Sequence, residues 1–188
     1  MARIGRLLTA MVTPFDEAGR VDYARARQLA ELLLASGSEG LVVAGTTGEG
    51  PTLTTEEKLR LFGEVCEAVG DRAAVIAGTC NYNTAESIAL SREAMGVGVT
   101  GILGTVPYYN KPPQEGLYQH FKAIAEAVPL PLILYNVPSR TVTNLLPETT
   151  VRLSAIDNIV GIKEASGNLA AIAKIIEGAG PDFLVWSG

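Results

Sequence analysis

Residues 159–188 read IVGIKEASGNLAAIAKIIEGAGPDFLVWSG, and this stretch decides the fold class. It begins with one apolar run, Ile159–Ile162, and ends in another, Phe183–Trp186. Between them lies a helical pattern, Leu169–Glu177, which Asn168 can cap. Both runs are short and apolar on both faces, which is typical of parallel strands covered by helices. The stretch therefore predicts a strand, a crossover helix and a parallel strand.

The same unit recurs along the chain at intervals of about thirty residues, the length of a βα unit. The upstream apolar runs are Leu7–Val12, Gly40–Ala44, Ala74–Gly78, Gly101–Val106 and Leu132–Tyr135. The helical stretches between them carry end signals: Asp22 before Tyr23–Ser36, Gly37 after it, a Thr54/Glu57 capping box before Lys58–Val69, Thr84, and Pro147 before Val151–Ala155. Seven strands and six helices compare with eight of each in a (β/α)8 barrel. We expect a single α/β domain over residues 1–188, a (β/α)8 TIM barrel truncated after the seventh strand, without its C-terminal strand and helices.

Composition excludes several classes of protein. The 188 residues are 47% hydrophobic and carry a formal net charge of −5, with the basic residues scattered. Nothing here resembles a nucleic-acid footprint, and neither a secretory signal around Met1–Arg6 nor a bilayer-spanning run is expected. Cys66 and Cys80 lack metal-ligand spacing and are expected to be reduced, buried thiols. We expect a cytoplasmic protein with no nucleic-acid or membrane partner.

One lysine differs from the others in its context. Lys163 ends an apolar strand, where partial desolvation lowers the pKa of its ammonium group and increases the fraction of free amine. Such an amine attacks a keto carbonyl to form an imine. The alternative is an ion pair with an acid such as Glu49, and strand position by itself favours that alternative. The other lysines lie in helical stretches or a polar loop: Lys58, Lys111, Lys122 and Lys174.

Hydroxyl groups and an arginine also follow predicted strands, where the active sites of barrels lie. Thr46, Tyr109 and Tyr135 could relay protons for imine chemistry, although any single tyrosine there is more simply a packing residue. Arg140 could clamp a substrate carboxylate or form a surface salt bridge, and the sequence favours neither. His120 is expected to be a solvated helix residue. The chain shows neither a metal-ligand cluster nor a dinucleotide or phosphate-loop fingerprint.

Four motifs carry a family resemblance. Gly45–Glu49, Pro107–Lys111, Tyr135–Thr141 and Gly161–Gly167 resemble the motifs of the class I pyruvate-dependent aldolases, most closely the dihydrodipicolinate synthase family. The similarity runs from Leu7 to Gly188, and the Tyr-Asn-Val-Pro-Ser-Arg-Thr turn is its most specific part. The resemblance implies a lyase of lysine and diaminopimelate biosynthesis that needs no cofactor or metal.

The resemblance also implies catalytic roles. Lys163 would form the imine with pyruvate, and Tyr135 would protonate the carbinolamine and the aldehyde-derived oxygen. Thr46 would join Tyr135 to Tyr109 in a proton relay. In the family, the residue matching Tyr109 comes from a neighbouring subunit, so a homo-oligomer is expected, either a dimer or a dimer of dimers (a homotetramer).

Substrate and effector positions follow in the same way. Thr47 would bind the pyruvate carboxylate, Arg140 the carboxylate of L-aspartate 4-semialdehyde, and Gly188 would complete the substrate site. The product would be 4-hydroxy-tetrahydrodipicolinate. Lysine-sensitive members bind lysine at positions that match Gly50, Pro51, Lys58, Tyr82, Glu86 and Tyr108. A cation at Lys58 would disfavour a bound lysine ammonium, so weak or absent lysine inhibition is expected.

Two other functions stay open. One is another pyruvate aldolase of the superfamily, cleaving N-acetylneuraminate or a keto-deoxy sugar acid. The other is a catalytically silent truncated fragment that associates through its exposed strand edges.

Overall fold

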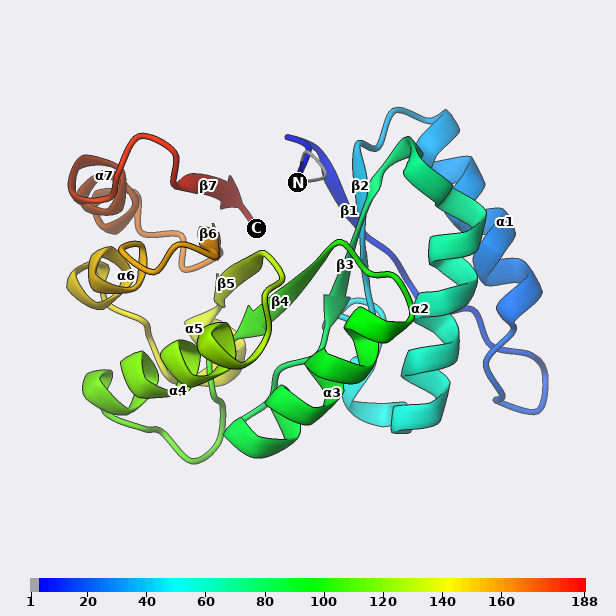
Figure 1. Cartoon of the computed structure of the whole chain (residues 1–188), viewed down its shortest axis with the longest axis horizontal. Helices are drawn as coiled ribbons and strands as arrows, with labels where there is room; N and C mark the ends of the chain where they lie inside the picture. Colours follow the sequence, from blue (N-terminus) through cyan, green and yellow to red (C-terminus); the bar gives the residue numbers. More distant parts are fainter. Residues whose placement is uncertain (1–3) are drawn as a thin grey trace. The chain divides into compact units, whose positions relative to one another are not determined.

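The structure is a computed structural model that describes residues 4–188 (Figure 1). Residues 1–3, part of the stretch in which no secretory signal is expected, lie outside the described residues. The strands are β1 Leu8–Ala10, β2 Gly40–Val43, β3 Ala74–Gly78, β4 Gly101–Thr105, β5 Leu132–Asn136, β6 Ile159–Glu164 and β7 Leu184–Ser187. The α-helices are α1 Tyr23–Ala35, α2 Thr55–Val69, α3 Thr84–Gly96, α4 Gln114–Ala127, α5 Pro138–Thr141, α6 Pro147–Leu153 and α7 Leu169–Gly178. This alternation confirms the predicted βα units.

The strands form a sheet in which the strand order follows the chain order. The pairs β1–β2, β2–β3, β5–β6 and β6–β7 are parallel. Strands β2 and β5 are buried along their whole length, as their apolar sequences predict. Strand β6 ends at Glu164, two residues beyond the apolar run and one beyond Lys163, where the strand was expected to end. Lys163 and Glu164 continue the backbone pairing with β5 and β7, and that pairing does not depend on side-chain polarity.

The chain divides into two compact units. The first consists of the chain up to Thr79 together with Leu90–Ile102, and the second of Cys80–Ala89 together with Leu103–Gly188. The expectation of a single domain over residues 1–188 stays a prediction.

In the first unit, α1 packs along α2 (Figure 1). Arg27 forms ion pairs with Glu64 and Glu67, and the Arg60 guanidinium lies 3.9 Å from the centre of the Tyr23 ring. Two predicted helix caps are confirmed. Asp22 caps α1, and the capping box that precedes α2 is complete, with both reciprocal hydrogen bonds formed.

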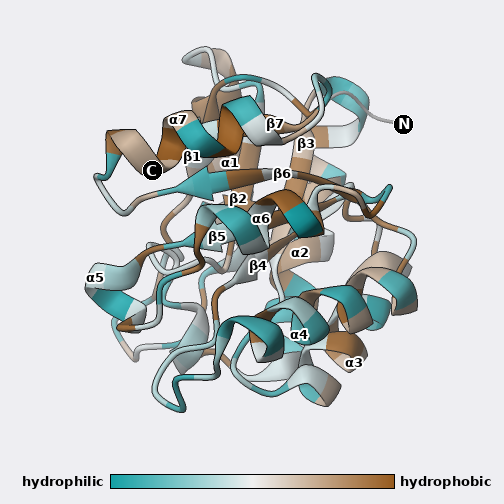
Figure 2. Ribbon diagram, turned by 90° about the vertical axis from the view of Figure 1, so that its left-hand side faces the viewer, coloured by the Kyte–Doolittle hydropathy of each residue, from teal (hydrophilic) through white to brown (hydrophobic). Residues whose placement is uncertain are grey.

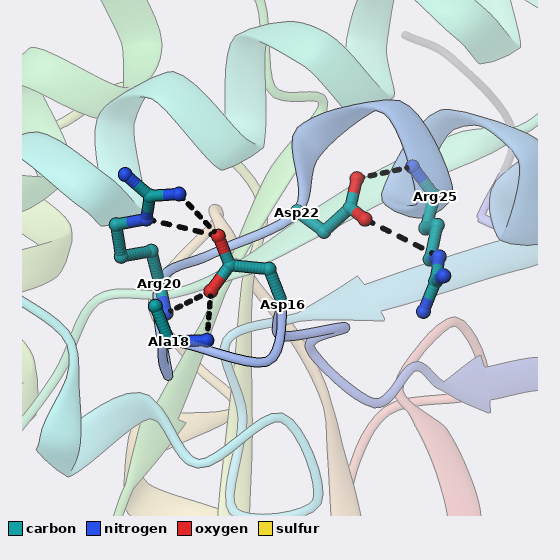
Figure 3. A network of polar contacts seen from close by, with 5 residues as sticks. All are labelled: Asp16, Ala18, Arg20, Asp22 and Arg25. Carbon is teal, nitrogen blue, oxygen red and sulfur yellow. Dashed lines mark hydrogen bonds and ion pairs between the residues drawn. The ribbon is translucent and has the colours of Figure 1, made fainter.

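The turn before α1 contains a small polar network (Figure 3). The Asp16 carboxylate accepts hydrogen bonds from the backbone N–H groups of Ala18 and Arg20 and from the Arg20 guanidinium, while Asp22 accepts from the Arg25 N–H. These bonds lower the pKa of Asp16. A shallow hollow lies over the turn, and two of the three carboxylates that line it, those of Asp16 and Asp22, accept hydrogen bonds within the turn. We therefore interpret the network as structural.

In the second unit, α4 packs beside α6, and α6 beside α7. Helices α6 and α7 alternate between hydrophobic and hydrophilic residues along their length, as helices with one packed face do (Figure 2). Asn158, at the turn before β6, donates its amide protons to the Ala125 carbonyl in the last turn of α4 and to the Val128 and Leu130 carbonyls that follow the helix. This side chain anchors the N-terminal end of β6.

His120 corrects the sequence analysis. It is 6% exposed rather than solvated, its Nδ1 lies 2.8 Å from Thr84 Oγ1, and its ring packs edge-on against Phe121. The cause is helical spacing: His120 follows Leu117 by three residues and precedes Ile124 by four, so all three share the buried face of α4. Burial lowers the pKa of His120 to about 4.

Cys66 and Cys80 are both of intermediate burial, so the expectation that they are buried is wrong. Burial still raises the pKa of Cys66 to about 11, which keeps it protonated at neutral pH. Within residues 4–188, no helix is both long and apolar enough to cross a membrane. The same residues contain no cluster of three or more His, Cys, Asp or Glu side chains that could hold a metal ion.

Candidate active site

Lys163 and Tyr135 are cross-strand neighbours at the C-terminal ends of β6 and β5. The lysine Nζ lies 4.4 Å from the centre of the tyrosine ring. Tyr135 is 6% exposed and Lys163 is half-buried. Burial lowers the pKa of Lys163, as predicted from its position in an apolar strand. The structure therefore places a partly desolvated amine beside the phenol ring of a tyrosine.

The alternative to a reactive amine is an ion pair. In the second unit, Lys122 pairs with Glu126 and Arg152 with Glu115. Among the described residues of this unit, no carboxylate forms an ion pair with Lys163. An amine without a carboxylate partner loses its proton more readily, because no negative charge stabilises the ammonium form.

Gly188 leaves space beside the lysine. A Cβ atom at this position would lie 3.1 Å from Lys163 Cε and 2.6 Å from the Ala165 Cβ. The Gly188 N–H donates to the Glu164 carbonyl, which holds the end of β7 against β6. A side chain here would clash with Ala165 and crowd the end of the Lys163 side chain, so this position favours glycine.

Arg140 lies in α5, one helical turn that follows β5 directly. The Thr141 hydroxyl donates to the Val137 and Thr143 carbonyls and closes this turn from within. Arg140 is exposed, and the described residues of the second unit give its guanidinium no carboxylate partner. Within this unit, the salt-bridge interpretation of Arg140 has no support, and the guanidinium is free to bind an added anion.

Tyr109 lies at the surface, in the loop after β4. It is 88% exposed, its φ is 70°, and its hydroxyl has no hydrogen-bond partner among the described residues. A tyrosine held in the left-handed region with its ring in solvent is strained and makes no packing contribution that would explain it. This exposure contradicts the alternative that Tyr109 is a packing residue within this chain.

Thr46 and Thr47 belong to the first unit, whereas Lys163 and Tyr135 belong to the second. Both threonines are exposed after β2, and the Thr46 carbonyl accepts the Glu49 N–H to close the loop. The buried Thr13 hydroxyl donates to the Gly48 carbonyl and supports the loop from below. Thr46 and Thr47 are therefore exposed on a loop that these hydrogen bonds hold.

Glycines in and beside this loop lie where a larger side chain would clash with backbone. A Cβ at Gly50 would lie 2.1 Å from the Ala44 carbonyl oxygen, and one at Gly78 would lie 2.3 Å from the same atom. Gly48 approaches the Met11 carbonyl in the same way. These residues let three backbone segments approach closely. This packing explains the glycines without a nucleotide-binding role.

The predicted effector positions are split between the units. In the first, Gly50 and Pro51 form a single 3-10 turn, and Lys58 is half-buried in α2, so its pKa is lowered by burial. In the second, the rings of Tyr82 and Tyr108 meet edge to face with centres 5.2 Å apart. Glu86 accepts hydrogen bonds from the side chains of two asparagines in the same segment, Asn81 and Asn83.

Two buried residues that the sequence analysis did not single out lie directly beside Lys163 and Tyr135. Asn136 follows Tyr135, Glu164 follows Lys163, and both are buried. The sequence did contain a signal for Glu164, a second ionisable residue that continues an apolar strand. A carboxylate at such a position must be hydrogen-bonded to be tolerated.

Comparison with known proteins gives consistent results. A model of the Dihydrodipicolinate synthetase family matches residues 3–188. The chain is 60% identical over 184 residues to a 4-hydroxy-tetrahydrodipicolinate synthase of Heliobacterium modesticaldum, covering 98% of the chain and 61% of that protein. It is 63% identical over 189 residues to the same-named protein of Symbiobacterium thermophilum, covering 100% of the chain and 64% of that protein. The chain therefore spans less than two thirds of the length of these relatives.

Solved structures give the same match. The structure of a dihydrodipicolinate synthase from Bacillus anthracis superposes with a TM-score of 0.98 at 51% identity, covering 100% of the chain and 64% of that structure. A structure of DHDPS from Cyanidioschyzon merolae with lysine bound superposes with a TM-score of 0.97 at 48% identity, covering 98% of the chain and 63% of that structure. These matches confirm the predicted α/β-barrel fold class.

Proposed function

Because the chain belongs to the dihydrodipicolinate synthetase family, we propose that it carries the Schiff-base chemistry of a 4-hydroxy-tetrahydrodipicolinate synthase. This lyase condenses pyruvate with L-aspartate 4-semialdehyde in lysine and diaminopimelate biosynthesis. We place it in the cytoplasm, as expected for a biosynthetic enzyme acting on these metabolites.

The observation that carries the proposal is the half-buried Lys163 amine beside Tyr135. The neutral amine adds to the keto carbon of pyruvate, and the resulting carbinolamine loses water once its hydroxyl group is protonated. Tyr135 supplies that proton. Tyr135, deprotonated in that step, takes a methyl proton, which converts the imine to an enamine. The enamine carbon attacks the aldehyde, and the aldehyde oxygen takes the proton from Tyr135. The amino group of the aspartate semialdehyde unit then displaces Lys163, which closes the ring and restores the free amine.

The remaining residues have assigned roles in this scheme. Thr46 and Tyr109 return the proton to Tyr135, Thr47 and Gly188 hold the pyruvate carboxylate, and Arg140 holds the carboxylate of the aldehyde. The exposed, strained Tyr109 supports a homo-oligomer, a dimer or a dimer of dimers, in which this tyrosine enters a neighbouring site. The unpaired Arg140 supports a carboxylate-bearing aldehyde over a sugar acid, whose hydroxyl groups need other partners.

The test is reduction of the imine. The chain is incubated with pyruvate and borohydride, and the adduct is located by intact-mass spectrometry and peptide mapping. We expect one adduct on Lys163, none in Lys163→Arg, and an unchanged adduct in Lys174→Arg, which alters an exposed lysine of α7. Adducts spread over the most exposed lysines, or no adduct at all, would show that the site is not assembled. Either result would favour the silent-fragment alternative.

Substrate choice is tested separately. Rates on aspartate semialdehyde and on N-acetylneuraminate are compared in the wild type and in Arg140→Ala. The proposal requires the first substrate to be preferred and the preference to shrink in the variant. A higher rate on N-acetylneuraminate would assign the chain to the sugar-acid lyases.

A further inference from the structure

Glu164 is a buried carboxylate next to the reactive lysine. It is 2% exposed, and its Oε1 accepts the Ser166 N–H at 2.7 Å. Its Oε2 accepts the Asn136 side-chain amide at 3.0 Å. Among the described residues of the second unit, no cation forms an ion pair with it. A carboxylate buried among neutral donors is costly unless both of its oxygens are occupied, and here both are.

Asn136 extends these bonds to a third segment. It is 1% exposed, and its Oδ1 accepts the Leu145 N–H at 3.0 Å. Its amide group also donates to Asn144 Oδ1 at 2.8 Å. Residues 144–145 follow the α5 turn that carries Arg140. The Glu164–Asn136 pair therefore joins the ends of β5 and β6 to the segment that returns from the arginine turn.

The Glu164–Asn136 pair lies on the opposite face of β5 and β6 from the Lys163–Tyr135 pair. Tyr135 lies opposite Lys163 in the ladder, and Asn136 lies opposite Glu164. Side chains alternate between the two faces of a strand, so the reactive pair faces one way and the buried amide–carboxylate pair the other. A shift of one residue between β5 and β6 would bury Lys163 and expose Glu164.

Backbone bonds link the same residues to the glycine beside the lysine. The Asn136 carbonyl accepts the Ala165 N–H at 2.9 Å, and the Glu164 carbonyl accepts the Gly188 N–H at 3.0 Å. The elements that carry Tyr135, Lys163, Arg140 and Gly188 are all connected through residues 136 and 164.

We propose that Glu164, through Asn136, is a positioning residue that holds Lys163 against Tyr135 and ties the Arg140 turn to the same frame. The inference rests on the proposed function, because the role is defined by the reactivity of Lys163. In this role Glu164 contributes to the reaction without touching the substrate.

The first variant is Glu164→Gln, which keeps the shape of the side chain. A glutamine has one acceptor oxygen for the two donors, so its own NH₂ group must face either the Ser166 N–H or the Asn136 amide. The reversed pair, Glu164→Gln with Asn136→Asp, restores the cross-strand bond, since the glutamine amide then donates to the aspartate. Asn158→Ala is the matched control, because it removes a clamp from the opposite end of β6.

Two readouts separate positioning from general stability. The first is the rate of pyruvate–borohydride trapping on Lys163. The second needs no pyruvate: trace acetylation of Lys163 by acetic anhydride across pH, quantified by peptide mass spectrometry. We expect trapping to fall by about 10- to 100-fold in Glu164→Gln, the range for a misplaced reactive group, with a changed acetylation profile. The reversed pair recovers most of both, and Asn158→Ala loses thermal stability but keeps both.

Far-UV circular dichroism establishes that each variant is folded. If Glu164→Gln does not fold, Glu164→Asp keeps the charge but draws the carboxylate away from Asn136, and it must change the same two readouts in the same direction. Wild-type reactivity of Lys163 in a folded Glu164 variant overturns the inference. If the wild type forms no pyruvate adduct while acetylation of Lys163 still responds to Glu164→Gln and recovers in the reversed pair, the proposed function fails and the positioning role stands.

Discussion

Acidification is expected to destabilise the chain through His120. The ring is buried in α4, its Nδ1 is engaged by the Thr84 hydroxyl, and its Nε2 has no hydrogen-bond partner within residues 4–188. Protonation would place a charge on a ring that has no anion beside it in the second unit. Burial lowers the pKa from 6.5 to about 4, so the folded protein keeps this histidine neutral.

The sign and size of the effect follow from linkage. Between pH 6.5 and about 4 the unfolded chain binds a proton that the folded chain rejects, so the free energy of unfolding falls as the pH falls. The contribution is fully present above pH 6.5 and is lost on acidification through this window. Its full size is about 3 kcal/mol, at 1.36 kcal/mol for each pH unit between the two pKa values. Domains of this kind are stable by about 5–15 kcal/mol, so the loss is large.

Urea unfolding at pH 7, 6, 5 and 4.5 measures this effect. His120→Asn retains an amide that can reach Thr84 but cannot be protonated in this range. The other titrating groups are the same in both proteins, so they cancel in the difference between the two pH profiles. We expect the variant to lose about 2–3 kcal/mol less than the wild type between pH 7 and 4.5. Parallel profiles would refute the assignment of a neutral, buried His120.

Three further predictions concern the site and the loop after β2. Tyr135→Phe should lower kcat by about 100-fold or more while pyruvate still binds, because the proton donor is lost, and steady-state kinetics would contradict this if kcat were unchanged. Gly50→Ala should lower the free energy of unfolding by about 1–3 kcal/mol, since its Cβ meets the Ala44 carbonyl oxygen at 2.1 Å, and equal urea midpoints would disprove the clash. Initial rates should change little with millimolar lysine and more in Lys58→His, because the Lys58 cation repels a second ammonium, whereas strong inhibition of the wild type would exclude this account.

Local sequence features predicted most of the architecture. Apolar runs located all seven strands of residues 4–188 to within two residues at each end, and caps such as Asp22 and the Thr54/Glu57 box located helix starts. These signals are read within a few residues, because helix period, strand period and capping are local properties. The same reasoning identified Lys163 as the lysine that ends an apolar strand.

Other features depended on tertiary contacts. His120 was expected in solvent, although its spacing from Leu117 and Ile124 already placed it on the apolar stripe of α4. The exposure of Tyr109 was also not predictable, because nothing near it in the sequence indicates whether the rest of the chain packs against the ring.

The sequence by itself determined the βα repeat, the lysine at the end of an apolar strand and the motifs of the family. Only the tertiary structure decided that Asn136 lies opposite Glu164 and that the two close a buried network behind Tyr135 and Lys163. These partners are 28 residues apart in the chain. Strand register is determined by backbone pairing and by which face is buried, and neither is encoded in the few residues around each partner.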